Sequence, residues 1–125
     1  MKVAFATKDG VNINDHFGWA TQFAIHEVDQ QGHRLVGMVQ VASSGDREDD
    51  KIAARIEAIA GASILYCEAI GPTAAAKVIK SRIHPIKLSE PQSIEAACEQ
   101  LSQMVSTNPP PWIKRILARE GSLDA

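Results

Sequence analysis

The fold is decided by the stretch SILYCEAIGPTAAAKVI, residues 63–79. Ser63 to Cys67 is a short apolar run of the length of a buried strand. Gly71-Pro72-Thr73 then opens a helix, because proline is well tolerated in the first helical turn. The inner face of that helix is predicted to consist of Ala74, Ala75, Val78 and Ile79. A strand followed at once by a helix is half of a βαβ unit, which indicates an α/β protein.

Downstream, the chain repeats the strand–helix order. Ile83 to Leu88 is predicted to be a strand that begins at His84-Pro85, since proline is tolerated at a strand start or edge. Ser89 and Gln92 have the spacing of a capping box for a following helix. The apolar face of that long helix is predicted at Ile94, Ala97, Cys98, Leu101 and Val105.

Upstream, the first third of the chain has the pattern of an antiparallel meander. Val3 to Thr7 is apolar on both faces and is predicted to be a central, buried strand. Two further strands are predicted over residues 22–28 and 33–41, joined by a hairpin turn. His26 and His33 lie in or beside this hairpin and are expected to be solvated.

A helix is predicted between the meander and the central stretch. Ile52, Ile56 and Ile59 fall on one helical face, caps are expected within residues 43–46, and Gly61 closes the helix. Right-handed crossovers put the first strand beside the fourth. We therefore expect an α/β fold with a mixed five-stranded sheet, a β-meander followed by βαβαβ, and flanking helices.

The composition is that of one ordinary globular domain. The 125 residues are 45% hydrophobic and 22% charged, with a net charge of −2. This balance lacks the basic footprint of a dedicated nucleic-acid binder. Two cysteines are too few for a disulfide framework or a four-cysteine metal site, and they suit a reducing compartment. Because no signal segment or membrane-spanning run is visible, we expect a cytoplasmic protein.

The end of the chain has a distinct composition. Residues 108–125 are predicted to be a proline-rich spacer and terminal helix of the same domain as residues 1–107, with Asn108 as the helix cap and a frayed end over 121–125. The apolar stripe of the helix is predicted at Trp112, Ile113, Ile116 and Leu117. Its basic residues are Lys114, Arg115 and Arg119. Two interpretations stay open: a helix packed on the domain, or one that docks on a partner.

Candidate site residues gather beyond the first and fourth strands, in the loops 8–18 and 68–73. Ligands of α/β sheets bind beyond the carboxyl ends of the central strands. His16 is a candidate metal ligand because imidazole suits iron, zinc and copper. A loop histidine that bonds its neighbours is the plainer alternative.

The neighbours of His16 have candidate roles of their own. Asp15 is a candidate to orient the ring, or is simply a turn carboxylate. Phe17 is expected to serve packing more than binding. Gly18 would let the backbone come close to a bulky ligand.

Three features near the central strands complete the candidate site. Cys67 precedes a helix N-terminus, a setting that can lower a thiol pKa and supply a second metal ligand; a buried, inert cysteine is the alternative. The turn Gly71-Pro72-Thr73 presents backbone N–H groups that would stabilise an anion, or is an ordinary turn. His84 is a candidate ligand or a structural residue, whereas Cys98 is expected to be only core.

A carboxylate-metal hydrolase is an alternative of another class. Asp9, Asp15 and Glu68 lie near one strand edge, and carboxylates can hold a divalent cation for hydrolysis. Their spacing matches no recognised motif, and no basic groove for a phosphate backbone accompanies them.

Several blocks together resemble the nitrogenase cofactor-biosynthesis accessory family of the NifX/NifY type. They are residues 1–7, 15–20 with the H-F-G motif, 69–78 and 83–87. The segment Asn108-Pro109-Pro110-Pro111-Trp112 points to the NifX branch. There are two departures: Cys67 stands where an aliphatic residue is expected, and a single glycine, Gly71, precedes Pro72.

The resemblance implies a non-enzymatic carrier with a ribonuclease H-like fold. Its cargo would be an iron–sulfur precursor of the iron–molybdenum cofactor, or the cofactor itself, with the H-F-G histidine, His16, as cluster ligand. Its partners would be the cluster-synthesising enzyme, a scaffold complex and apo-nitrogenase. The alternative within the family is a docking regulator that holds no stable cluster.

Overall fold

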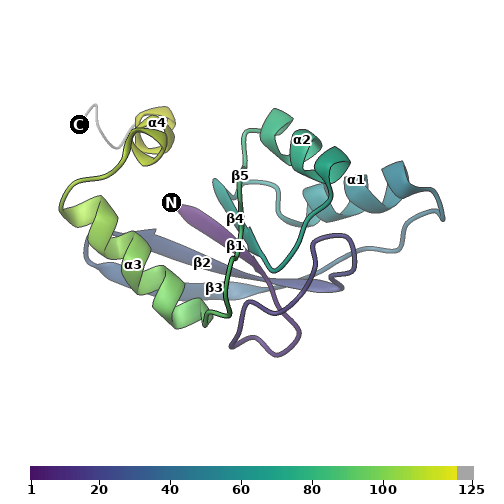
Figure 1. The fold of residues 1–125 in the computed structure, drawn as a ribbon, viewed down its shortest axis with the longest axis horizontal. Helices are drawn as coiled ribbons and strands as arrows, with labels where there is room; N and C mark the ends of the chain where they lie inside the picture. The colour runs from purple at the N-terminus through teal and green to yellow at the C-terminus, as the bar shows by residue number, and fades with distance from the viewer. Residues whose placement is uncertain (121–125) are drawn as a thin grey trace.

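The computed structural model describes residues 1–120. Its elements are β1 (Lys2–Ala6), β2 (Gln22–Asp29), β3 (Gly32–Gln40), α1 (Glu48–Ala58), β4 (Ile64–Cys67), α2 (Pro72–Lys80), β5 (His84–Lys87), α3 (Ile94–Ser106) and α4 (Pro111–Arg119). The sheet order is β3-β2-β1-β4-β5 (Figure 1). β2 is antiparallel to β1 and β3, whereas β4 is parallel to β1 and β5. The predicted mixed five-stranded sheet, with the first strand beside the fourth, is confirmed; the expectation for residues 121–125 lies outside the described residues.

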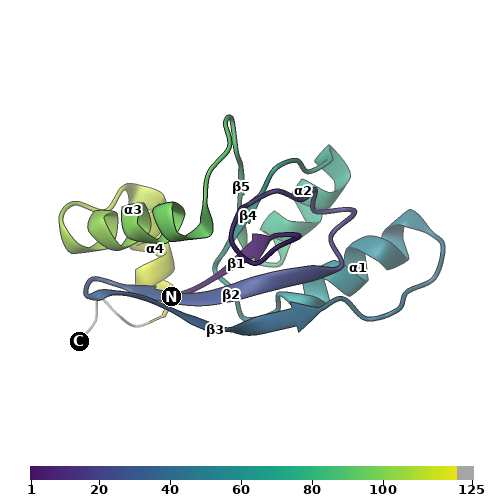
Figure 2. The ribbon, with the colours of Figure 1, turned by 90° about the horizontal axis from the view of Figure 1, so that it is seen from below.

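Helices cover both faces of the sheet and bury two hydrophobic cores. The core under α3 and α4 includes Val3 and Phe5, whereas the core under α1 and α2 includes Ala4 and Ala6. Successive residues of β1 therefore alternate between the two cores, because neighbouring side chains of a strand face opposite sides. Figure 1 and Figure 2 show the two helix pairs on either side of the strands. The prediction of a central, buried first strand is confirmed.

The cap of α3 differs from the predicted capping box. The helix begins after Ser93, whose Oγ accepts the Ala96 N–H at 3.1 Å. The preceding segment pairs instead with the loop after β1, where Ile13 N–H donates to the Gln92 carbonyl at 3.1 Å. This pairing holds Gln92 outside the helix, so the prediction of a capping box at residues 89–92 is wrong.

The caps predicted for α1 and α4 are also wrong. The N-caps are Arg47 and Pro110, and neither side chain makes a capping hydrogen bond. The acidic first turn of α1 complements the helix dipole, and proline fixes φ at the start of α4. Residues 43–46 and Asn108 therefore play no capping part, and buried faces hold these helices in place.

The burial of α2 differs from prediction at one position. Ala74 and Val78 face the core, but the side chain of Ile79 is 61% exposed. A helix turns about 100° per residue, so the residue after Val78 points away from the sheet.

The terminal helix α4 packs against the domain. Ile113, Ile116 and Leu117 are buried, and the Trp112 ring stacks on His84 with centroids 4.3 Å apart. Lys114, Arg115 and Arg119 are exposed, as a packed helix with a solvated basic face requires. None of the helices within residues 1–120 combines the length and the apolar character needed to cross a membrane.

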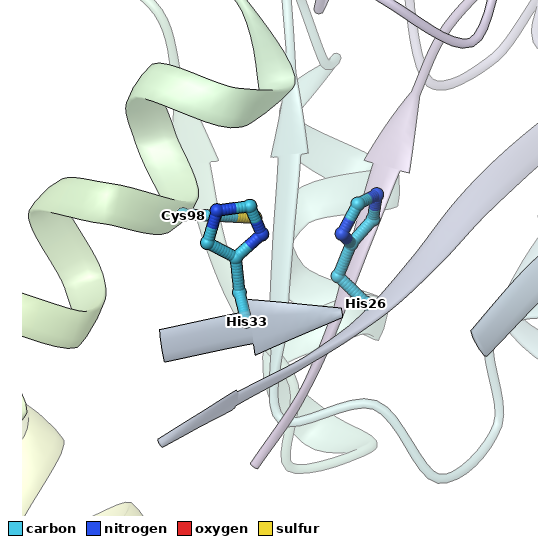
Figure 3. Close-up of side chains that lie close together, drawn as sticks. All are labelled: His26, His33 and Cys98. Atoms are coloured by element: carbon cyan, nitrogen blue, oxygen red, sulfur yellow. The ribbon is translucent and has the colours of Figure 1, made fainter. Parts of the chain in front are cut away.

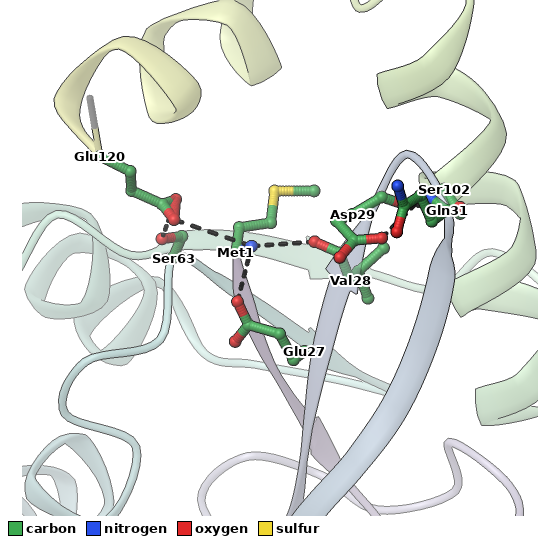
Figure 4. A network of polar contacts seen from close by, with 8 residues as sticks. All are labelled: Met1, Glu27, Val28, Asp29, Gln31, Ser63, Ser102 and Glu120. Carbon is green, nitrogen blue, oxygen red and sulfur yellow. Dashed lines mark hydrogen bonds and ion pairs between the residues drawn. The ribbon is translucent and has the colours of Figure 1, made fainter. Parts of the chain in front are cut away.

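Polar contacts fasten the end of α4 to the first strand. The Met1 amino group donates to the Val28 carbonyl at 2.8 Å and lies 3.3 Å from Glu27 Oε1 and 3.7 Å from Glu120 Oε1 (Figure 4). Ser63 Oγ donates to Glu120 Oε2 at 3.1 Å. One carboxylate therefore bridges the start of β1 and the residue before β4.

Candidate functional site

The loops that follow β1 and β4 are joined by backbone hydrogen bonds. The Glu68 N–H donates to the Asp15 carbonyl, and the Phe17 N–H donates to the Ala69 carbonyl, both at 2.9 Å. His16 and Ala69 form an isolated parallel bridge. The two loops thus meet at the carboxyl edge of the sheet, as predicted, and α2 begins shortly after the bridge.

The first part of the loop is held by Asp9. Its Oδ1 accepts the Val11 and Asn12 N–H groups at 2.9 and 2.8 Å, and its Oδ2 accepts the Asn12 and Asn14 side-chain amides at 3.2 and 3.3 Å. Hydrogen bonds to the charged form hold the pKa of this carboxyl well below its usual range. Asp9 is therefore a loop organiser whose oxygens are already engaged.

The imidazole of His16 lies against an exposed indole. The ring stacks on Trp19 with centroids 4.0 Å apart and planes 3° apart, and Trp19 is 69% exposed. The Trp19 and Ala20 N–H groups donate to the His16 carbonyl at 3.2 and 3.0 Å, so a tight turn places the two rings together. The other neighbour is Glu68, whose Oε1 lies 3.6 Å from His16 Nε2. The ring plane is thus fixed while part of the ring stays open to solvent.

Of the two roles predicted for Asp15, the structure agrees with the turn carboxylate and not with a residue that orients the ring. Its carboxylate is buried, and its Oδ1 accepts the backbone N–H of His16 at 2.9 Å. The carboxylate beside the imidazole belongs to Glu68 instead. Asp15 therefore shapes the backbone of the turn.

The two residues after His16 differ in burial. Phe17 is fully buried and its ring lies 5.9 Å from that of Phe23, which confirms a packing role. Gly18 is exposed, and a side chain placed there would meet nothing within 4 Å. The surface at Gly18, two residues after the histidine, is therefore open.

Of the two interpretations of Cys67, the structure agrees with the buried, inert cysteine and not with a lowered pKa. Its side chain is fully buried in the core under α1 and α2, and its Sγ donates to the Ile86 carbonyl at 3.9 Å. Burial raises the pKa of the thiol to about 11, although the Lys87 ammonium acts in the opposite sense. A thiol enclosed in the core does not reach a cluster held at the surface.

His84 lies at the other end of the sheet from His16. It pairs with Ile64, the first residue of β4, whereas Cys67 at the carboxyl end pairs with Lys87. The structure therefore does not bring His84 to the His16 edge, because the parallel register places it at the amino ends of the strands.

The start of α2 remains near the bridge between the loops. Gly71 is the N-cap, no side chain caps the helix, and Pro72 and Thr73 are exposed. First-turn N–H groups of a helix lack intrahelical partners. They are thus available to an anionic group at this edge.

Two residues of the site carried no assigned ligand-positioning role in the sequence. Trp19 follows His16 by three residues, and only the turn between them reveals that the rings stack. Glu68 is the first residue after β4, and only the bridge between the loops puts it beside the imidazole. The available signal was an aromatic residue next to the H-F-G motif.

Comparison with known proteins identifies the family. Residues 1–104 match the family described as dinitrogenase iron-molybdenum cofactor. The chain belongs to this family. The H-F-G motif, Trp19, Glu68 and the start of α2 all lie within the matched residues, whereas α4 lies beyond them.

Two named proteins and one solved structure resemble the chain over most of its length. The protein NifX of Sinorhizobium fredii is 34% identical over 97% of this chain and 80% of its own. The FeMo cofactor biosynthesis protein NifB of the same organism is 35% identical over 81% of this chain and 21% of its own. The crystal structure of PH0822 covers 90% of this chain and 99% of its own at 21% identity, and its TM-score of 0.65 shows the same fold. The NifX/NifY-type resemblance is thereby confirmed.

Proposed function

We propose that this protein acts in the biosynthesis of the iron–molybdenum cofactor as a carrier. Its cargo is an iron–sulfur precursor of the cofactor, or the cofactor itself, and His16 is the residue that coordinates this cargo. The observation that carries the proposal is the solvent-accessible His16 ring, held flat against Trp19 at the edge where two loops meet. The family description and the name of the related NifB support a role in this biosynthesis.

The chemistry of this edge suits reversible binding of a bulky anionic cluster. Imidazole is a borderline ligand that suits iron. The free N–H groups at the start of α2 favour an anion, and the surface at Gly18 is open. The nearest thiol, Cys67, is buried in the core. A single imidazole with backbone donors holds a cluster less firmly than four thiolates, so the cargo can be passed on.

Glu68 favours release of the cargo. Its carboxylate lies 3.6 Å from His16 Nε2, where it repels an anionic cluster. The Glu68 side chain is 54% exposed and is free to swing away when the nitrogen is taken by iron. Cargo binding is thus opposed by a nearby negative charge, which keeps the affinity moderate.

The proposal involves no catalysis by this chain. The hydrolase alternative needs Asp9 and Asp15 as metal ligands, but loop hydrogen bonds engage the oxygens of Asp9, and Asp15 is buried and accepts the His16 N–H.

The proposed partners are the cluster-synthesising enzyme, a scaffold complex and apo-nitrogenase, in the cytoplasm. The ribonuclease H-like label for the fold stays a prediction.

A docking regulator is the second candidate function. A groove of about 430 Å³ runs between the end of α2, β5 and α4. Arg82, Arg115 and Arg119 line it, so three guanidinium groups would meet an acidic partner surface. In this alternative the groove matters for function and His16 does not.

An anaerobic titration with an isolated iron–sulfur precursor of the cofactor separates the two candidates. Binding is followed by the visible absorption of the cluster and by co-elution, for wild type, His16→Ala and His84→Ala. The carrier proposal expects binding to be lost in His16→Ala and kept in His84→Ala, which lies at the far end of the sheet. Circular dichroism checks that each variant is folded. Equal binding by wild type and His16→Ala, or none by wild type, contradicts the proposal.

A further inference from the structure

Three metal-binding side chains meet under α3, away from the His16 edge. They are His26 on β2, His33 on β3 and Cys98 on α3 (Figure 3). One ligand atom of each lies within 4.8 Å of the others. Both histidines are half-buried and Cys98 is fully buried, so the prediction of solvated histidines is wrong.

Backbone pairing and helix packing explain this convergence. His33 is paired with Val28, two residues from His26, so the two imidazoles are diagonal neighbours on one face of the hairpin. Their ring centroids are 5.9 Å apart. Helix α3 is fastened over the same hairpin by Ser102, whose Oγ donates to the Asp29 carbonyl at 2.6 Å. Cys98 lies one helical turn before Ser102 and therefore faces the histidines.

Two nitrogen atoms in this cluster lack partners. The Nδ1 atoms of His26 and His33 are buried and make no hydrogen bond. Buried polar atoms in native proteins almost always have a partner. Two unpartnered imidazole nitrogens beside a thiol are an arrangement that a metal ion would satisfy.

The surroundings of the cluster are largely apolar and shield it from solvent. Cys98 is fully buried in the core under α3 and α4, and both histidines are half-buried. The Phe5 ring, 5.5 Å from that of His26, adds an apolar wall.

We propose that His26, His33 and Cys98 bind one thiophilic transition-metal ion, of the Zn²⁺ class, at a site separate from the His16 edge. Two imidazoles and a thiolate suit zinc and copper, and three protein ligands leave a fourth position for water or an exogenous ligand. On binding, the Cys98 S–H bond breaks, the metal–sulfur bond forms and the proton passes to solvent.

The observed spacing requires a small closure. Zinc lies about 2.0 Å from nitrogen and about 2.3 Å from sulfur, so tetrahedral ligands are roughly 3.5 Å apart. A separation of up to 4.8 Å must therefore shrink by about one ångström. His33 lies at the start of β3 beside the hairpin turn, where a small rotation of its side chain supplies this movement.

Cobalt titration of the full chain tests the proposal, because Co²⁺ replaces zinc and gives a thiolate-to-metal absorption band. Wild type is expected to bind one Co²⁺ per chain with this band, and Zn²⁺ is expected to bleach it. Cys98→Ser should abolish the band, and His33→Ala should weaken binding more than tenfold. Cys67→Ser is the matched control, because this other buried thiol lies in the opposite core and its loss should leave the band unchanged.

The outcomes keep this site distinct from cargo binding. His16→Ala should bind Co²⁺ like wild type, whatever its effect on an iron–sulfur cargo. The proposal is overturned if wild type binds no Co²⁺, if the bound ion lacks the thiolate band, or if Cys98→Ser and His33→Ala bind as wild type does. If Cys98→Ser fails to fold, Co²⁺ binding is compared between wild type, His33→Ala and His33→Gln, because His33 is only half-buried.

Discussion

Replacing Trp19 by alanine should weaken cargo binding by about two- to tenfold while leaving the stability of the fold nearly unchanged. The indole stacks on His16 at 4.0 Å and is 69% exposed, so it positions the ring and adds little to the core. An aromatic pair of this kind contributes about 0.5–1.5 kcal/mol beyond its buried area. Without the indole, the imidazole becomes ordered only when the cargo binds. The binding free energy is then less favourable by about the stacking contribution.

The assay is the anaerobic titration with an isolated cofactor precursor, paired with urea unfolding. Trp19→Phe should recover part of the affinity, because a phenyl ring still stacks on the imidazole. Trp112→Ala is the control, since Trp112 stacks on His84 at the other end of the sheet. An unchanged dissociation constant in Trp19→Ala would refute the argument that the stack prepares His16 for binding. So would an equal loss in Trp112→Ala.

Three further predictions follow from charges and burial. Glu68→Gln should tighten binding of an anionic cluster by a few fold in the same titration, because it removes the charge 3.6 Å from His16 Nε2; weaker binding would show instead that Glu68 helps to hold the cargo. Burial lowers the pKa of His26 and His84 from the ordinary 6.5 in the folded state, so the unfolded state takes up more protons in that range. The free energy of unfolding should therefore be greatest above pH 6.5 and should decrease as the pH drops below 6.5. A lower melting temperature at pH 8 than at pH 5.5 would contradict this. Ile113→Ala should cost about 2–5 kcal/mol in urea unfolding, because this side chain lies on the inner face of α4 and is fully buried. The exposed Ile79→Ala should change stability by less than about 0.5 kcal/mol, and similar losses in both would contradict the packing described for α4.

Strong local patterns made the sheet predictable. The apolar run from Val3 to Ala6 has no polar face, so it belongs at the centre of a sheet covered on both sides. The step at Gly71-Pro72 marks the start of α2 with little ambiguity. The cap of α3 was missed because the pairing of Gln92 with Ile13 joins residues distant in sequence, and local spacing carries no record of such contacts.

The candidate site was predictable only in part. The element order indicates that the loops after β1 and β4 meet, and the bridge between His16 and Ala69 confirms this. The spacing of residues does not say that Cys67 points into the core, that Glu68 replaces Asp15 beside the ring, or that Trp19 covers it. Side-chain direction at the end of a strand depends on what packs across the sheet, and a single sequence does not contain that information directly.

The histidines of the hairpin illustrate the same limit. A polar turn between two strands predicts side chains exposed to solvent, and this is the prediction for His26 and His33. Helix α3 crosses the hairpin in the fold and buries both imidazoles against Cys98. Because α3 is far from the hairpin along the chain, their proximity is a property of the tertiary structure alone.

The opposite positions of His16 and α4 on the sheet imply a modular division of the molecule. His16 lies at the carboxyl ends of β1 and β4, whereas α4 packs at the amino ends of β4 and β5, through Trp112 on His84 and Glu120 on Ser63. The family match ends before α4 begins. Substitutions on the exposed surface of α4 therefore leave the contacts around His16 unchanged. If the chain is the carrier proposed above, a docking surface on α4 and the edge that holds the cargo can be altered independently of each other.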